Sequence, residues 1–203
     1  MSDRKKIILA SSSPRRKELL SLTGLKFTVD SGDFEEEMTS SISPRALARR
    51  LSRGKAETVA LKYRNALVIA ADTFIVFRRK LLGKPHTRKE AVKMLGTLNG
   101  RTHSVITGFT ILDTASGKIT SRSVETRVHF RKLTAPEILA YARTGEPLDK
   151  AGGYAIQGMG SLLISGIEGD YFNVIGLPLA ALAEALRDFG VFVLKSWGRR
   201  RKL

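Results

Sequence analysis

The segment 8–20, ILASSSPRRKELL, places hydroxyl and guanidinium groups at the predicted start of a helix. Pro14 suits the first helical position, so Arg15 and Arg16 fall in the first turn, where the positive end of the helix dipole disfavours cations. A bound phosphate would reverse this preference, because free backbone N–H groups, hydroxyls such as that of Ser11, and guanidinium groups all bind phosphate oxygens. The alternative is that the arginines point into solvent and the serines form only a turn.

Two groups of carboxylates are candidates for metal binding or proton transfer. Asp72 closes the apolar run 66–72, ALVIAAD, which predicts a buried strand ending at Asp72, and open α/β sheets bind ligands at such ends. A carboxylate there can hold a divalent cation or accept a proton from water, unless it caps the next turn through Thr73. The acidic segment 33–38, DFEEEM, could add a Mg²⁺ ligand or could be a solvated loop.

Two further segments carry single polar side chains within predicted turns. Lys84 of LGKP is suited to reach a phosphate. Gln157 lies in the glycine-rich segment 149–160, DKAGGYAIQGMG, where an amide could read the edge of a base. No GxxxxGK[ST] motif occurs, and no dinucleotide-binding fingerprint follows the first predicted strand. ATP-driven work and NAD chemistry therefore lose support.

The composition is that of a globular chain with an unusually high positive charge. The chain has no cysteine, which excludes disulfides and thiolate metal sites, and its three histidines do not have the spacing of a zinc site. No apolar run approaches the roughly 20 residues of a membrane span, and no secretory signal is evident, so we expect a cytoplasmic protein. The formal charge of +16 indicates an anionic partner such as a nucleotide, a nucleic acid or a membrane surface.

The elements that must position these side chains mix strands with helices. Apolar runs predict buried strands at 6–11 and 66–72, alternating patterns predict strands at 102–113 and 121–133, and a further strand is expected near 161–167. Helices are expected at 43–63, 87–99, 136–144 and 178–190, with Gly54 weakening the first of these. The segments FRRK (77–80) and KSWGRRRKL (195–203) are expected to be a hairpin tip and a frayed tail. This pattern predicts a mixed α/β protein.

Together these segments resemble the Maf family of nucleoside triphosphate pyrophosphatases over residues 7–189. A single motif of this kind is weak evidence, whereas eight in the same order are strong. The residues that carry the resemblance are LASSSPRRKELL, FEEEM, Lys55-Ala56, AADT, LGKP, MLGTLNGRTHSVITG, EPLDKAGGYAIQG and GDYFNVIGLPL.

The resemblance implies a fold and a reaction. The fold would be the two-lobed α/β architecture of the inosine triphosphate pyrophosphatases, a mixed β-sheet with flanking helices. Residues 1–194 would form a single domain with the active site in the cleft between its lobes, followed by the basic tail 195–203. The enzyme would hydrolyse a nucleoside triphosphate between its α- and β-phosphates, with Mg²⁺, or alternatively Mn²⁺ or Co²⁺. The resemblance also suggests a homodimer.

The resemblance assigns roles residue by residue. The phosphate-binding positions are Ser11, Arg15, Arg16, Lys55 and Lys84. Glu36 is the essential acidic position and Asp72 the proton acceptor, and both would hold the metal. The residues that differ between substrate subgroups are Arg15, Thr73 and Gln157.

The motifs SPRR, ADT and AIQG are similar to the subgroup acting on dTTP and UTP, whereas the subgroup acting on 7-methyl-GTP tends to have Trp in place of the first Arg. Modified pyrimidine nucleotides remain possible substrates. Two features depart from the family pattern. The approach VDSGDFEEE leaves Glu35 as an alternative to Glu36, and Gly54 is unusual next to Lys55.

The competing class is a basic nucleic-acid-binding or cell-division protein, in keeping with the septum-inhibition phenotype associated with the family. Such a protein would bind DNA or RNA with a strong salt dependence. Aromatic residues interleaved with the basic clusters would favour this class, but FRRK has one Phe and the tail one Trp. The sequence therefore favours the pyrophosphatase.

Overall fold

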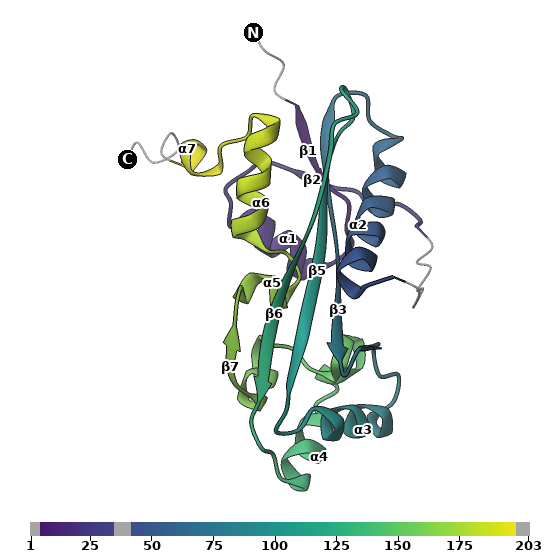
Figure 1. Ribbon diagram of the computed structural model, residues 1–203, viewed down its shortest axis with the longest axis vertical. Helices are drawn as coiled ribbons and strands as arrows, with labels where there is room; N and C mark the ends of the chain where they lie inside the picture. Colours follow the sequence, from purple (N-terminus) through teal and green to yellow (C-terminus); the bar gives the residue numbers. More distant parts are fainter. Residues whose placement is uncertain (1–4, 35–41, 198–203) are drawn as a thin grey trace. The chain divides into compact units, whose positions relative to one another are not determined.

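The computed structural model describes residues 5–34 and 42–197 of the protein (Figure 1). The strands are β1 (Lys6–Leu9), β2 (Thr28–Val29), β3 (Ala66–Phe77), β4 (Lys80–Leu82), β5 (Thr102–Asp113), β6 (Ile119–Phe130) and β7 (Ile164–Glu168). The α-helices are α1 (Pro14–Ser21), α2 (Pro44–Ala60), α3 (Arg88–Leu98), α4 (Ala135–Arg143), α5 (Tyr171–Ile175), α6 (Leu179–Leu186) and α7 (Val193–Trp197). The 3₁₀ helices are η1 (Glu146–Asp149), η2 (Ala151–Gly153), η3 (Gly158–Leu163) and η4 (Arg187–Phe189).

The strands of the described residues form one seven-stranded mixed sheet. Its order is β2-β1-β3-β5-β6-β7, and β4 pairs with β3. β1 runs parallel to both β2 and β3, whereas the β3–β4 and β6–β7 pairs are antiparallel. The predicted mixed α/β class is thereby confirmed. Within the described ranges, no helix is long and apolar enough to cross a membrane.

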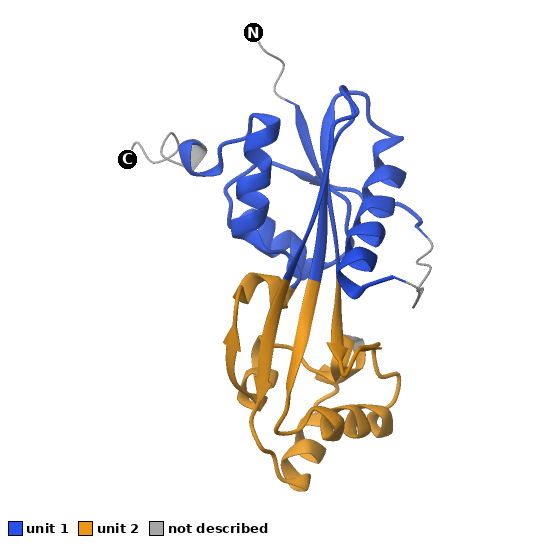
Figure 2. Ribbon diagram, in the orientation of Figure 1, with its two compact units in different colours: residues 1–72, 107–124, 176–203 blue, residues 73–106, 125–175 orange. Residues whose placement is uncertain are grey.

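The chain divides into two compact units, which Figure 2 colours separately. Unit 1 comprises Met1–Asp72, Thr107–Val124 and Gly176–Leu203, and unit 2 comprises Thr73–Ile106 and Glu125–Ile175. The long strands β3, β5 and β6 contribute residues to both units. The expectation of one domain with a cleft between its lobes stays a prediction.

The core of unit 1 forms where α2 packs on β1 and β3. The helix starts at the Ser43 cap, whose Oγ accepts a hydrogen bond from the backbone N–H of Ala46 at 3.3 Å. One face of the sheet meets α2 in a cluster that includes Ile8, Ala56 and Val68. Figure 1 shows α2 on one side of these strands and α1 and α6 on the other. Strand residues 66–71 are therefore all buried, as the continuous apolar run predicts.

The contact between α2 and β5 requires a glycine. A Cβ on Gly108 would lie 2.1 Å from the backbone oxygen of Ala48, a distance that no side chain can occupy. Next to this contact, the hydroxyls of Ser52 and Thr110 hydrogen-bond at 2.9 Å. The backbone of the helix thus lies directly against the strand, which fixes α2 on the sheet.

The core of unit 2 packs α3 and α4 on the other parts of the long strands. It includes Ile75 from β3, Val105 from β5, Val128 from β6, Leu95 from α3 and Ile138 from α4. Helices α3 and α4 begin directly after the predicted caps Thr87 and Thr134. The Thr87 hydroxyl accepts from the backbone N–H of Glu90 at 3.2 Å, and the side chains of Thr134 and Glu137 form a capping box.

Several expected elements differ from the structure in their bounds: the strand predicted at 6–11 ends at Leu9, and the strand predicted at 121–133 covers Ile119–Phe130. Residues 161–163 of the predicted strand form part of η3, and the strand begins only at Ile164. The last long helix ends at Leu186 instead of Gly190, and η4 follows it, because Gly190 takes a positive φ and the N–H of Val191 closes back on the carbonyl of Leu186. Residues 195–197 of the expected tail belong to α7, which is held by the buried side chain of Val193.

Candidate active site

The first part of the site lies in unit 1, where β1 ends beside β3. Leu9 pairs with Ile69, and the backbone N–H of Ala10 donates to the carbonyl of Ile69 at 2.7 Å. Ser11 follows two residues after Leu9, and Asp72 three residues after Ile69. Because the strands are parallel, both side chains lie beyond the carboxyl end of β1.

Asp72 does not end its own strand, contrary to the prediction, and it does not cap a turn through Thr73. β3 continues to Phe77 because residues 73–77, TFIVF, are β-branched or aromatic and the last three pair with β4. Because β1 ends at Leu9 while β3 continues to Phe77, Asp72 has no residue of β1 beside it. The carboxylate is mostly buried, with 10% of its side chain exposed.

Arg16 is held at the start of α1 by two acceptors. Its Nε donates to the backbone oxygen of Gly176 at 3.0 Å, and its Nη1 donates to Ser11 Oγ at 3.4 Å. The same Ser11 oxygen accepts from the backbone N–H of Ser13, the cap of α1. These contacts bring together Ser11 and Arg16, two of the predicted phosphate-binding residues. Arg15, on the same helix turn, is half-buried.

Lys55 reaches Asp72 from α2. The Lys55 ammonium donates to Asp72 Oδ1, and 19% of the lysine side chain is exposed. Lys55 thus places an ammonium directly beside the carboxylate of Asp72.

The second part of the predicted site lies in unit 2. Thr73 is half-buried in β3, Lys84 is exposed in the turn after β4, and Gln157 is half-buried directly before η3. The turn and the glycine-rich segment meet, because the backbone N–H of Gly152 donates to the carbonyl of Gly83 at 2.9 Å.

Glu146 organises the segment that follows Gln157, a role that the sequence analysis did not assign. Its carboxylate accepts from the backbone N–H groups of Met159 at 3.3 Å and Gly160 at 3.1 Å, and from the Tyr141 hydroxyl at 3.1 Å. The only signal in the sequence is a lone acidic residue just before a glycine-rich segment. The carbonyl of Gly176, which holds Arg16, leaves no signal at all because it is a backbone group.

The predicted acidic residues Glu35 and Glu36 lie outside the described residues. Across residues 5–34 and 42–197, no group of three or more His, Cys, Asp or Glu side chains is arranged to hold a metal ion. Of the two predicted metal ligands, Glu36 and Asp72, Asp72 lies within the described residues.

Comparison with known proteins decides the family. The profile of the family described as Maf-like protein matches residues 6–189, which is nearly the whole chain. The chain belongs to the Maf family. Residues of the Maf motifs form both the Ser11–Arg16 contact and the Lys55–Asp72 pair of unit 1.

Several relatives of this Maf protein carry the name dTTP/UTP pyrophosphatase. The protein of Desulforamulus reducens is 48% identical over 188 residues, covering 93% of this chain and 98% of the relative. The protein of a Thermoanaerobacter species is 50% identical over 191 residues, covering 93% and 100%. The protein of Methanosarcina barkeri is 47% identical over 192 residues, covering 94% and 98%.

Among solved structures, the Ham1 protein of Staphylococcus aureus matches with a TM-score of 0.49 and 15% identity, covering 79% of this chain and 80% of that one. This likeness is too weak to carry an argument about the present protein.

Proposed function

We propose that this Maf protein hydrolyses dTTP and UTP to the nucleoside monophosphate and pyrophosphate. The observation that carries the proposal is the mostly buried Lys55–Asp72 pair, which lies in the same compact unit as the Ser11–Arg16 contact. A carboxylate able to take a proton is thus combined with cations able to neutralise phosphates. The names of the relatives identify the substrates to test first.

Asp72 is the proposed proton acceptor. A water molecule attacks the α-phosphorus in line with the bridging oxygen of the β-phosphate, and its proton passes to the Asp72 carboxylate. The new bond joins the water oxygen to the α-phosphorus. The bond from the α-phosphorus to the bridging oxygen breaks, so pyrophosphate leaves with the electron pair.

The cations of unit 1 stabilise the charge of the leaving group. Arg16 supplies a guanidinium whose direction is set by Gly176 and Ser11. Arg15 lies in the same helix turn, and Lys55 adds an ammonium next to Asp72. In phosphoryl transfer, most of the catalysis is such positioning and charge neutralisation.

A divalent cation fits the donors of this site. Asp72 supplies one carboxylate, and Mg²⁺ bound with a nucleotide usually takes only one or two protein carboxylates besides phosphate oxygens. Asp72 would hold the cation together with Glu36, with Glu35 as the alternative. Mg²⁺ is the proposed cation, with Mn²⁺ or Co²⁺ as substitutes. When bound, the cation would neutralise phosphate charge and polarise the phosphoryl oxygens.

The remaining predicted residues are proposed to bind and select the nucleotide. Lys84 would contact a phosphate, whereas Thr73 and Gln157 would choose the base together with Arg15. Gln157 supports this assignment because its amide offers both a donor and an acceptor at the start of a segment that Glu146 holds in place.

The proposed function is tested by measuring pyrophosphate release from a panel of nucleoside triphosphates. The panel contains the common ribo- and deoxyribonucleotides, modified pyrimidine triphosphates and 7-methyl-GTP, each with Mg²⁺, Mn²⁺, Co²⁺ or EDTA. We expect the highest kcat/KM for dTTP and UTP and no turnover in EDTA. Release of pyrophosphate only from 7-methyl-GTP would contradict the substrate assignment.

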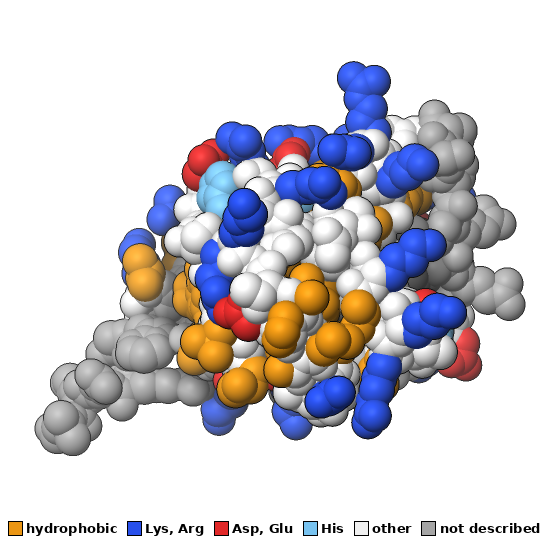
Figure 3. Space-filling model, turned by 90° about the horizontal axis from the view of Figure 1, so that it is seen from below, with side chains coloured by type: hydrophobic (Ala, Val, Ile, Leu, Met, Phe, Trp, Pro, Cys, Tyr) orange, Lys and Arg blue, Asp and Glu red, His pale blue; other side chains and the backbone are white. Residues whose placement is uncertain are grey.

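The same assay separates the enzyme from a nucleic-acid-binding protein. On the face of the molecule in Figure 3, lysines and arginines are spread around a group of hydrophobic side chains and form no continuous stripe. A binding surface for nucleic acid usually gathers its positive charge on one face or along one helix. Salt-dependent binding to DNA or RNA without pyrophosphate release would favour the binding protein.

A further inference from the structure

A short extended segment of unit 1, residues 30–34, runs along α2 and is called the strap below. At its start, the Asp30 carboxylate accepts from the Lys62 ammonium at 2.8 Å and from the Tyr63 hydroxyl at 2.8 Å. Both hydrogen bonds lower the pKa of Asp30, that to Lys62 more strongly. The strap is therefore tied to the chain just beyond the carboxyl end of α2.

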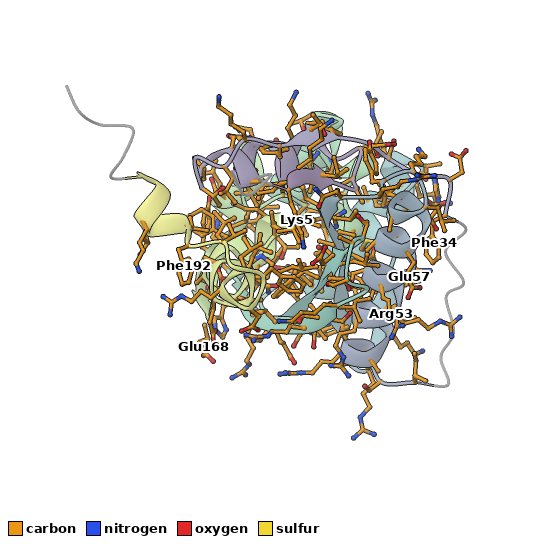
Figure 4. All side chains as sticks on the ribbon, turned by 90° about the horizontal axis from the view of Figure 1, so that it is seen from above. Lys5, Phe34, Arg53, Glu57, Glu168 and Phe192 are labelled. Atoms are coloured by element: carbon orange, nitrogen blue, oxygen red, sulfur yellow. The ribbon has the colours of Figure 1, made fainter. Side chains whose placement is uncertain are left out.

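The next two contacts of the strap depend on glycines. A Cβ on Gly32 would lie 2.9 Å from Thr58 Cγ2, so the strap backbone touches α2 directly at this point. A Cβ on Gly54 would lie 2.2 Å from Cε2 and 2.3 Å from Cζ of Phe34. Gly54 thus leaves a notch on the helix, and the Phe34 ring fills it. Figure 4 shows Phe34 beside α2, on which Arg53 and Glu57 are also labelled.

The contacts follow one another at regular intervals along both segments. Strap residues 30, 32 and 34 meet helix-side residues 62, 58 and 54. Two extended residues advance about 6.6 Å, close to the about 5.4 Å of one helical turn. The strap therefore runs antiparallel to α2 and makes one contact for each turn, ending at Phe34 and Gly54.

The last contact of the strap lies directly before Lys55 in the sequence. Glycine within a helix costs about 1 kcal/mol relative to alanine, so Gly54 weakens α2 in its middle. The contact that the Phe34 ring makes in the notch offsets this cost. The same contact fixes the chain at residue 34, from which the acidic residues 35–37 follow in the sequence.

We propose that Gly54 and Phe34 are positioning residues for the phosphate site. The ring of Phe34, seated at Gly54, holds the strap against the helix turn that presents Lys55 to Asp72. This inference rests on the proposed function, because it concerns the placement of groups that act on the triphosphate.

The test compares two glycine-to-alanine variants in α-helices. Gly54→Ala removes the notch and displaces the Phe34 ring. Gly96→Ala is the matched control, since a Cβ on Gly96 of α3 would meet nothing within 4 Å. We expect Gly96→Ala to raise Tm by about 2–4 °C and to leave kcat and KM unchanged. We expect Gly54→Ala to lower kcat/KM for dTTP at least about 10-fold, because small displacements of positioned groups are costly.

Phe34→Ala and the double variant complete a thermodynamic cycle. Phe34→Ala removes the ring without adding atoms to α2, and we expect the same loss of kcat/KM as for Gly54→Ala. Since both changes abolish one contact, the double variant should be no worse than the poorer single variant. All assays are made well below the Tm of each variant, so that a difference in kcat/KM does not reflect unfolding.

The outcomes separate the inference from the proposed function. If either single variant keeps kcat/KM within about twofold of wild type, or if the two losses multiply in the double variant, the positioning role is wrong while the proposed function stands. If neither the wild type nor Gly96→Ala releases pyrophosphate from dTTP or UTP, the proposed function fails and the inference fails with it.

Discussion

At the residue scale, Arg16 shows how the cations at the start of α1 become useful. Its guanidinium is directed by the Gly176 carbonyl and by Ser11 Oγ, so its charge lies where β1 ends instead of in bulk solvent. The unfavourable interaction of this cation with the helix dipole is thus accompanied by the placement of a hydrogen-bond donor in the site.

We predict that Arg16→Ala raises KM for dTTP and lowers kcat. Arg16→Lys keeps the positive charge, so its KM should lie between those of Arg16→Ala and wild type. Its kcat should stay close to that of Arg16→Ala, because an ammonium cannot reproduce the fixed directions of a guanidinium. Steady-state pyrophosphate release measures both constants. Arg127→Ala is the control, since 56% of the Arg127 side chain is exposed and it pairs with Glu168 on the surface. Unchanged kcat and KM in Arg16→Ala would remove Arg16 from the phosphate site.

His103 carries a second residue-scale consequence, this time for stability. The residue is 3% exposed, its Nε2 hydrogen-bonds to the Tyr154 hydroxyl at 2.7 Å, and its ring packs edge-on against Phe130. Burial, and to a lesser degree the nearby His129, lowers the pKa of His103 from 6.5 to about 4. The folded protein therefore resists protonation of this imidazole.

The lowered pKa predicts a loss of stability in acid. Below about pH 6.5 the unfolded chain binds a proton at His103 that the folded chain binds only near pH 4, so stability falls across this window by up to about 3 kcal/mol. Urea unfolding at several pH values measures the effect. The curve for His103→Gln should be flatter between pH 6.5 and 4. Parallel curves for the two proteins would show that His103 does not cause the loss.

At the element scale, the hairpin between β3 and β4 has a turn that its residues do not favour. Phe77 pairs with Lys80, and the two residues between them, Arg78 and Arg79, have φ values of 49° and 64°. Two consecutive positive φ values are typical of a type I′ turn, for which Asn-Gly is preferred. The two arginines therefore hold a strained conformation that each would avoid elsewhere.

Replacing Arg78-Arg79 with Asn-Gly should stabilise the protein by about 1 kcal/mol and raise Tm by about 2–4 °C. Thermal unfolding measures the change, and kcat and KM should stay unchanged because neither arginine belongs to the proposed site. A lower Tm would show that the contact of Arg78 with the Phe77 ring outweighs the strain of the turn.

Elements with strong local signals could be predicted from the sequence, whereas those decided by distant contacts could not. The strand 102–113 and the Thr134 cap follow from alternation and capping chemistry. The extension of β3 past Asp72 depends on pairing with β4. The contact of Phe34 with the notch at Gly54 joins residues 20 positions apart. The sequence alone therefore indicates only that Gly54 weakens the helix.

At the scale of the whole molecule, the predicted site residues are divided between two compact units. Ser11, Arg15, Arg16, Lys55 and Asp72 belong to unit 1, and Thr73, Lys84 and Gln157 belong to unit 2. The sequence identified these residues through the order of the Maf motifs. It could not predict the Lys55–Asp72 pair, which depends on how α2 packs on the sheet, because the two residues are 17 positions apart and belong to different elements.

The central claim is that Asp72 accepts the proton in pyrophosphate release, and Asp72→Asn tests it most directly. Glu57→Gln is the matched control, since it makes the same chemical change on the exposed side of α2, where Glu57 pairs with Arg53. With dTTP and Mg²⁺, we predict that Asp72→Asn keeps the circular dichroism spectrum of wild type but loses at least about 100-fold in kcat, while Glu57→Gln keeps normal turnover. Near-normal turnover by a folded Asp72→Asn variant would contradict the account.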